Sequence, residues 1–203
     1  MFLRPAAAIF LAFALAGCAP STRIVQQWQD EAFSGKPFKR LLVLGVTTDA
    51  TLRRVFEDEF SAGLRARGIE AVQGYTLLPD DGPVERARIE RAMREAKADG
   101  AIVTRVLRVD RRVEVVPAGP PMQQGFFGWY GSAWGGPLWP GYAQPPAVFQ
   151  FDQVYVESQL WDVRTDRPVW SAVSEIFAPS NPRADAITYS RVILDALAAR
   201  KLI

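Results

Sequence analysis

The chain of 203 residues contains no histidine and a single cysteine, Cys18. The absence of histidine removes the side chain that proteins use most often as a general base and as a metal ligand. One cysteine can form neither an internal disulfide nor a cysteine-ligated metal cluster. A histidine-dependent catalytic triad is therefore excluded, and the sequence predicts neither a metal site nor a bound cofactor.

The sequence also lacks the short motifs that identify several common classes of enzyme. It has no Gly-x-Ser-x-Gly elbow, no Ser-x-x-Lys pair, no glycine-rich phosphate loop and no dinucleotide fingerprint. Basic and acidic residues are nearly balanced at 24 and 22, and no basic stripe stands out, which argues against nucleic acid as a partner. We therefore expect a protein that is not an enzyme.

Residues 1–17 have the pattern of an export signal. Arg4 supplies a positive start, and Pro5 to Ala14 form an apolar, uncharged stretch. An apolar core of about 7–15 residues followed by small residues is typical of a secretory signal. Because a membrane-spanning helix needs about 20 apolar residues, a transmembrane anchor is the weaker interpretation.

Residues 15–18, Leu-Ala-Gly-Cys, resemble the lipobox of bacterial lipoproteins. The resemblance implies cleavage between Gly17 and Cys18, and a membrane anchor made of lipid on Cys18. An ordinary signal peptide with a chance cysteine is the alternative. Ala19, in place of aspartate, is similar to the sorting pattern of outer-membrane lipoproteins. It implies a location at the inner leaflet of the outer membrane, facing the periplasm.

The rest of the chain is expected to form a lipidated tether over 18–36 and a single domain over 37–203. The tether has few large apolar residues, and docking as an edge strand is its alternative. Expected strands cover 40–46, 69–75, 101–116, 149–163 and 168–178, with helices between 49 and 68, between 83 and 99, and over 184–200. The order β-α-β-α-β, insertion, β-β-α predicts an α/β (α+β) fold with a mixed sheet of about five strands and helices packed on it.

Helical spacing indicates which residues face the core and which face solvent. Apolar candidates recur at spacings of mostly three and four residues, at Leu52, Val55, Phe56, Phe60 and Leu64, and at Ile187, Ile193, Leu194 and Leu197. The charged residues Arg53, Glu57, Asp58 and Arg67 fall largely on the other faces, and Glu57 to Glu59 form the densest acidic run. A helix spreads that run over about 200°, so a solvated surface is expected rather than a shared site. Glu175 is expected to be a paired or edge-exposed carboxylate, with an inward position as the alternative.

A hairpin with tryptophans near its tip carries a broader resemblance. Trp161 and Trp170 flank the predicted turn at 164–167. The segments Leu-Trp-Asp-Val-Arg-Thr (160–165) and Val-Trp-Ser-Ala (169–172), together with the lipobox and the first βαβ pattern, resemble a group of uncharacterised bacterial lipoproteins with a domain of unknown function. The resemblance implies an envelope location and a fold, but no activity.

Residues 117–148 are expected to form an insertion that carries no charge and is rich in glycine, proline and aromatic residues. The aromatic residues are Phe126, Phe127, Trp129, Tyr130, Trp134, Trp139 and Tyr142. Dense glycine and proline argue against a regular helix or strand, yet large aromatic groups are unfavourable in water. Three interpretations stay open: a loosely collapsed loop, a cover over the sheet, or a contact surface for a membrane, glycan or partner protein.

These patterns favour a membrane-anchored periplasmic lipoprotein that is a non-catalytic binding or assembly component of the cell envelope. Its expected partners are the membrane, through lipid on Cys18, and an unidentified envelope protein or glycan. Two alternatives remain, namely a carboxylate-dependent envelope hydrolase and a purely structural envelope lipoprotein.

Overall fold

The computed structural model describes residues 21–79, 86–116 and 147–203. Its strands are β1 (Thr22–Gln29), β2 (Arg40–Val46), β3 (Glu70–Gln73), β4 (Gly100–Val116), β5 (Ala147–Asp162) and β6 (Arg167–Phe177). Its helices are α1 (Ala50–Arg65), the 3₁₀ turn η3 (Gly74–Thr76), α2 (Arg86–Glu95) and α4 (Pro182–Ala199). The predicted mixed α/β fold, with helices packed on a mixed sheet, is confirmed.

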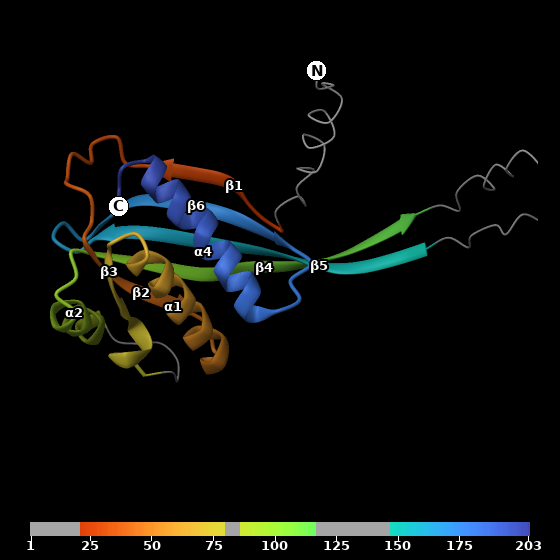
Figure 1. The fold of residues 1–203 in the computed structure, drawn as a ribbon, viewed down its shortest axis with the longest axis horizontal. Coiled ribbons are helices and arrows are strands. Elements are labelled where there is room, and N and C mark those ends of the chain that lie inside the picture. Colours follow the sequence, from red (N-terminus) through yellow and green to blue (C-terminus); the bar gives the residue numbers. More distant parts are fainter. Residues whose placement is uncertain (1–20, 80–85, 117–146) are drawn as a thin grey trace, which may run out of the picture.

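The sheet has six strands in the order β1-β6-β5-β4-β2-β3 (Figure 1). Strand β2 is parallel to β3 and to β4, and the remaining neighbours are antiparallel. The expected number was about five. The additional strand is β1, in which residues 22–29 pair with β6. The sequence predicted a tether for this segment, with an edge strand as the alternative, and the edge strand is what the structure shows.

The helices cover the two faces of the sheet unequally. Helices α1 and α4 pack together over the face that carries Leu41 and Val43, whereas α2 packs on the opposite face, against Leu42 and Leu44. This division follows from the strand geometry, since successive side chains of β2 point to opposite faces. Because β2 is covered on both faces, its sequence has to be apolar at nearly every position, as the run 41–44 is.

Strands β5 and β6 form the predicted tryptophan hairpin. Leu160 pairs with Trp170 and Trp161 pairs with Pro168, so the two tryptophans lie on adjacent strands as expected. Trp170 is fully buried beneath the helices, while Trp161 lies on the other face and is only partly buried. The core role therefore belongs to Trp170.

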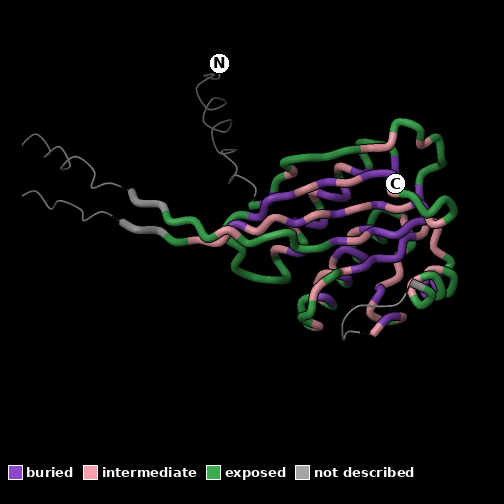
Figure 2. The backbone as a smooth tube through the Cα atoms, turned by 180° about the vertical axis from the view of Figure 1, so that it is seen from behind, coloured by how far each residue is buried: buried purple, intermediate pink, exposed green. Residues whose placement is uncertain are grey.

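Strands β4 and β5 continue together beyond the rest of the sheet. Pairing between β5 and β6 ends at Gln153 and Phe177, whereas β4 and β5 stay paired as far as Val116 and Ala147. The two strands therefore project as a two-stranded arm (Figure 1). Figure 2 shows buried residues in the centre of the sheet and mainly exposed ones where the arm leaves it.

Two sets of predicted functional residues lie outside the described part of the chain. Residues 1–20 contain the expected signal peptide, Gly17 and Cys18, and residues 117–146 contain all seven aromatic residues of the expected insertion. The last two residues assigned to that insertion, Ala147 and Val148, belong to β5.

The helix-face predictions were correct in the C-terminal half of α1 and of α4 and wrong toward the N-terminus of each helix. Phe60, Leu64 and Ile193 are fully buried, as predicted. Ile187, in contrast, is 40% exposed, because it lies on the solvent side of the seam between α1 and α4. Leu52 is also exposed, because the first turn of α1 borders an open groove rather than another element.

The buried indole gives the first testable prediction. Trp170→Ala should lower the free energy of unfolding by about 3–5 kcal/mol, because it removes a fully buried aromatic group from a packed core. The matched Trp161→Ala change should cost clearly less, since that indole is only partly buried. Urea unfolding of the purified variants measures both losses, and equal losses would contradict the assignment of the core face.

Candidate functional site

An open apolar groove of about 480 Å³ lies at the end of the sheet where the arm begins. It is bordered by the first turns of α1 and α4 and floored by β4, β5 and β6. Its apolar lining comes from Val46, Leu52, Phe56, Val106, Val109, Val154, Val156, Ile176 and Ala186. Ligand pockets commonly measure about 300–1,000 Å³, so the groove is large enough to hold a ligand or part of one.

Several of these apolar side chains are unusually exposed. Val46 is 56% exposed, Val106 48% and Val109 55%. A single exposed valine needs no explanation, but a cluster that lines one concave surface often marks a binding site. The groove is therefore the leading candidate for a functional surface in the described residues.

A β-bulge places Val106 and Val109 on the same face of β4. Val106 pairs with Val156 and Val109 pairs with Val154, and the register shifts between Val106 and Arg108. In a regular strand, residues three apart point to opposite faces, so one of these valines would leave the groove. The extra residue of the bulge restores the alternation and keeps both on the groove side.

A chain of three hydroxyl groups lies at the floor of the groove. The Thr104 and Ser158 oxygens are 2.5 Å apart, and the Ser158 oxygen is 2.8 Å from the phenol of Tyr189. All three residues are buried, and burial raises the pKa of the Tyr189 phenol, which therefore stays neutral. These hydroxyl groups form hydrogen bonds with one another. The floor therefore contains polar groups whose hydrogen bonds are already made within the protein.

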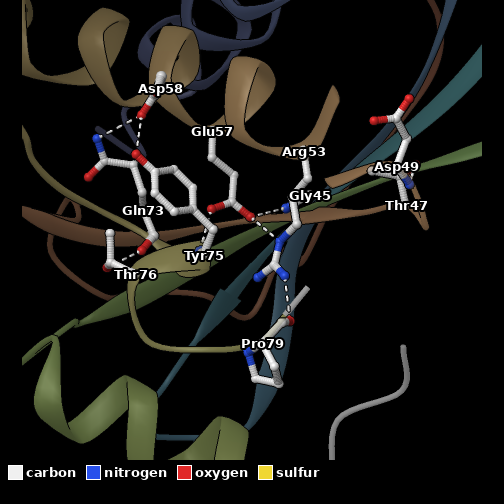
Figure 3. Close-up of polar contacts among 10 residues, drawn as sticks. All are labelled: Gly45, Thr47, Asp49, Arg53, Glu57, Asp58, Gln73, Tyr75, Thr76 and Pro79. Atoms are coloured by element: carbon white, nitrogen blue, oxygen red, sulfur yellow. Dashed lines mark hydrogen bonds and ion pairs between the residues drawn. The ribbon is translucent and has the colours of Figure 1, made fainter. Parts of the chain in front are cut away.

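The wall formed by α1 contains a buried ion pair (Figure 3). Glu57 is fully buried, and its Oε1 accepts hydrogen bonds from Arg53 Nε at 3.0 Å and from the Gly45 amide at 2.9 Å. Its Oε2 accepts from the Tyr75 amide at 2.7 Å. Arg53 in turn donates to the Pro79 carbonyl at 2.7 Å. The pair therefore ties the first half of α1 to the end of β2 and to the segment after β3.

Burial raises the pKa of Glu57, and its hydrogen bonds and the Arg53 charge oppose that rise. The close approach of η3 to β2 adds a steric condition. A Cβ on Gly74 would contact Leu44 and lie 2.8 Å from the Val43 carbonyl oxygen, closer than real Cβ atoms come. Glycine at position 74 thus allows η3 to approach β2 closely enough for the Tyr75 amide to donate its hydrogen bond to Glu57.

The acidic run on α1 does not form one site. Asp58 is exposed, as predicted, and accepts a hydrogen bond from the Tyr75 hydroxyl at 2.7 Å, while Glu59 accepts one from Arg183 at 2.6 Å. The expectation of a solvated surface was wrong for Glu57 and for Arg53, whose mutual bonding allows both to be buried on the core side of the helix.

Glu175 has the predicted role of a paired carboxylate. It is only 7% exposed, accepts a hydrogen bond from Arg23 at 3.0 Å, and also bonds Gln153. Its side chain lies on the face opposite the groove, because neighbouring Ile176 lines the groove. The expected carboxylates are therefore dispersed over the fold.

Two further searches covered residues 21–79, 86–116 and 147–203. In these residues no group of three or more histidine, cysteine, aspartate or glutamate side chains is placed to hold a metal ion. No helix in the same ranges is both long and apolar enough to cross a membrane.

Comparison with known proteins gives weak likenesses only. The chain matches no protein-family model and no curated protein. Among solved structures, it is similar to the PelC dodecamer from Paraburkholderia phytofirmans, at 18% identity over 85% of this chain and 94% of that one, with a TM-score of 0.44. It is also similar to lipoprotein GNA1162 from Neisseria meningitidis, at 14% identity over 78% and 98% of the two chains, with a TM-score of 0.41.

A third likeness is to a minor lipoprotein from Acinetobacter baumannii, at 11% identity over 80% of this chain and 94% of that chain, with a TM-score of 0.31. Bacterial lipoproteins are thus among the structural neighbours. Identities and TM-scores this low carry no argument about the function of this chain.

The ion pair in the groove wall gives the second prediction. Glu57→Ala should lower the free energy of unfolding by about 3–5 kcal/mol, because it removes the carboxylate that balances the buried charge of Arg53. The double variant Arg53→Met with Glu57→Leu should recover much of that loss, since both charges are then replaced by apolar groups. Urea unfolding of Arg53→Met, of Glu57→Leu and of the double variant completes a double-mutant cycle, and strictly additive losses would show that the two side chains do not depend on each other.

Proposed function

We propose that this protein is a lipid-anchored component of the bacterial cell envelope whose folded domain binds an apolar group and catalyses no reaction. The observation that carries the proposal is the groove, in which exposed aliphatic side chains line a concave surface next to polar groups that are already bonded. Water leaves such a surface readily when an apolar partner covers it.

The polar groups near the groove support binding over catalysis. Both oxygens of Glu57 accept hydrogen bonds from the protein, and Tyr189 is buried and neutral. At the rim, the Asp185 carboxylate accepts hydrogen bonds from the backbone amides of Ser180 and Asn181. A carboxylate-dependent hydrolase needs two carboxyl groups that face a shared space beside the substrate, and these acids serve the fold instead.

The anchor in this proposal is the lipid on Cys18, expected from the lipobox-like residues 15–18. The first strand begins at Thr22, so only residues 19–21 separate the expected lipid from the sheet. The anchored domain would therefore stay close to the membrane. Ala19 supports the inner leaflet of the outer membrane as its location.

The expected aromatic surface of residues 126–142 fits this proposal as a second contact for an envelope protein or glycan. Strand β4 ends at Val116 and β5 begins at Ala147, both at the far end of the arm and away from the helices. The arm also carries Val113, which is 61% exposed.

The anchor is tested by Cys18→Ser. The variant should remain an unmodified precursor, because serine offers no thiol for lipid attachment. Mass spectrometry of the intact chain, together with membrane fractionation, measures processing and lipid. A mature, lipid-bearing Cys18→Ser protein would contradict the anchor, whereas a Cys18→Ala control should behave like Cys18→Ser.

The groove is tested by a photo-crosslinking residue placed at Val109 in the full chain, in cells. Illumination should give a discrete adduct, because a bound apolar group lies in van der Waals contact with that position. The matched control is Val25, which is 46% exposed on β1 and outside the groove. Equal adduct yields and identities at the two positions would contradict the groove as a binding site.

A further inference from the structure

The chemistry of the groove lining selects an alkyl chain over a polypeptide. The Asn181 side chain caps α4 by accepting hydrogen bonds from the backbone amides of Arg183 and Ala184. The Asp185 carboxylate accepts hydrogen bonds from two backbone amides of the preceding loop. The hydroxyls at the floor bond one another. A peptide brings a donor and an acceptor with every residue, and these side chains offer it few partners. An alkyl chain has no polar groups to satisfy.

The start of β1 brings the N-terminal end of the domain to the same place. Thr22 pairs with Ile176, which lines the groove, and the carbonyl of Ser21 accepts the amide of Phe177 at 2.7 Å. Thr22 and Ile176 have side chains on the same face of the sheet, since they are directly opposed on neighbouring strands. The chain thus enters the sheet beside the groove.

The length of chain before β1 limits how far the expected lipid can lie from the groove. Cys18 precedes Ser21 by three residues, and three fully extended residues span at most about 10–11 Å. Ser21 is fixed at the groove end of β6 by its hydrogen bond to Phe177. A long acyl chain on Cys18 therefore reaches the groove without any change in the described residues.

From these observations we infer that the groove holds one acyl chain of the lipid attached to Cys18. This rests on the proposed anchor and names the apolar group that the groove binds. The acyl chain lies against Val109, Val154 and Ile176 on the sheet and against Leu52 on α1 opposite. The protein thereby shields part of its own lipid anchor from water. The bound acyl chain enters the bilayer only by leaving the groove.

The experiment uses the full chain produced in bacteria that are fed a fatty acid carrying a photoreactive diazirine and a terminal alkyne. The cells incorporate this fatty acid into lipoproteins, and illumination joins it to whatever it contacts. We expect the Cys18 lipopeptide to be covalently linked to peptides that contain Val109, Val154 or Ile176. Mass spectrometry of the digested protein identifies these links.

Two matched variants control the assignment. Val109→Glu should lower the yield of groove links by about ten-fold, because an alkyl chain cannot replace the hydration of a carboxylate. Val25→Glu, at another exposed valine outside the groove, should leave the yield unchanged. Both positions are exposed, so neither change removes a core residue.

The remaining outcomes separate the proposed anchor from this inference. A parent protein with no fatty acid on Cys18 overturns the anchor and the inference together. A labelled Cys18 whose links lie only in phospholipid or other proteins leaves the anchor standing and overturns the inference. Groove links that persist in Cys18→Ser show that a free lipid occupies the groove, which also overturns it.

Discussion

The buried Glu57 carboxylate holds together the part of the fold on which the groove depends. It accepts hydrogen bonds from the ends of two chain segments, at Gly45 and Tyr75, and from Arg53 on its own helix. A buried carboxylate is costly unless it is fully bonded, so these segments are fixed relative to α1. Leu52 and Phe56, on the same turns of α1, form one wall of the groove. The ion pair beside that wall therefore joins it to β2 and to the segment after β3.

The floor of the groove arises from the way β4 and β5 leave the sheet. Up to Thr104 and Ser158 these strands are covered by helices, and their side chains are buried or partly buried. Beyond that point they continue as an arm, with neither β2 nor β6 beside its outer part. The bulge near Leu107 keeps apolar side chains directed to the groove side at this transition. An apolar surface therefore remains open where the helices end and where β1 brings in the N-terminal segment.

All the described strands except β1, together with the helices and the hairpin, could be predicted because each depends on local pattern. The run 40–46 and the spacing of Phe60 and Leu64 indicated their elements correctly. The buried state of Glu57 could not be predicted, since an arginine four residues before a glutamate is equally typical of an exposed helix. The groove could not be predicted either, because Val109 and Ile176 come to lie on either side of Val154 only through strand pairing and a bulge that periodicity does not reveal. The only available signal was the excess of valines along an otherwise charged strand.

The account depends most directly on what fills the groove in the lipidated protein. A crystal structure of the chain carrying its natural lipid tests this without variants or probes. The account predicts continuous electron density for an alkyl chain between Val109 and Ile176, ending above the Tyr189 hydroxyl and continuous with the lipid on Cys18. Ordered water in the groove, with every acyl chain directed away from the domain, would contradict it.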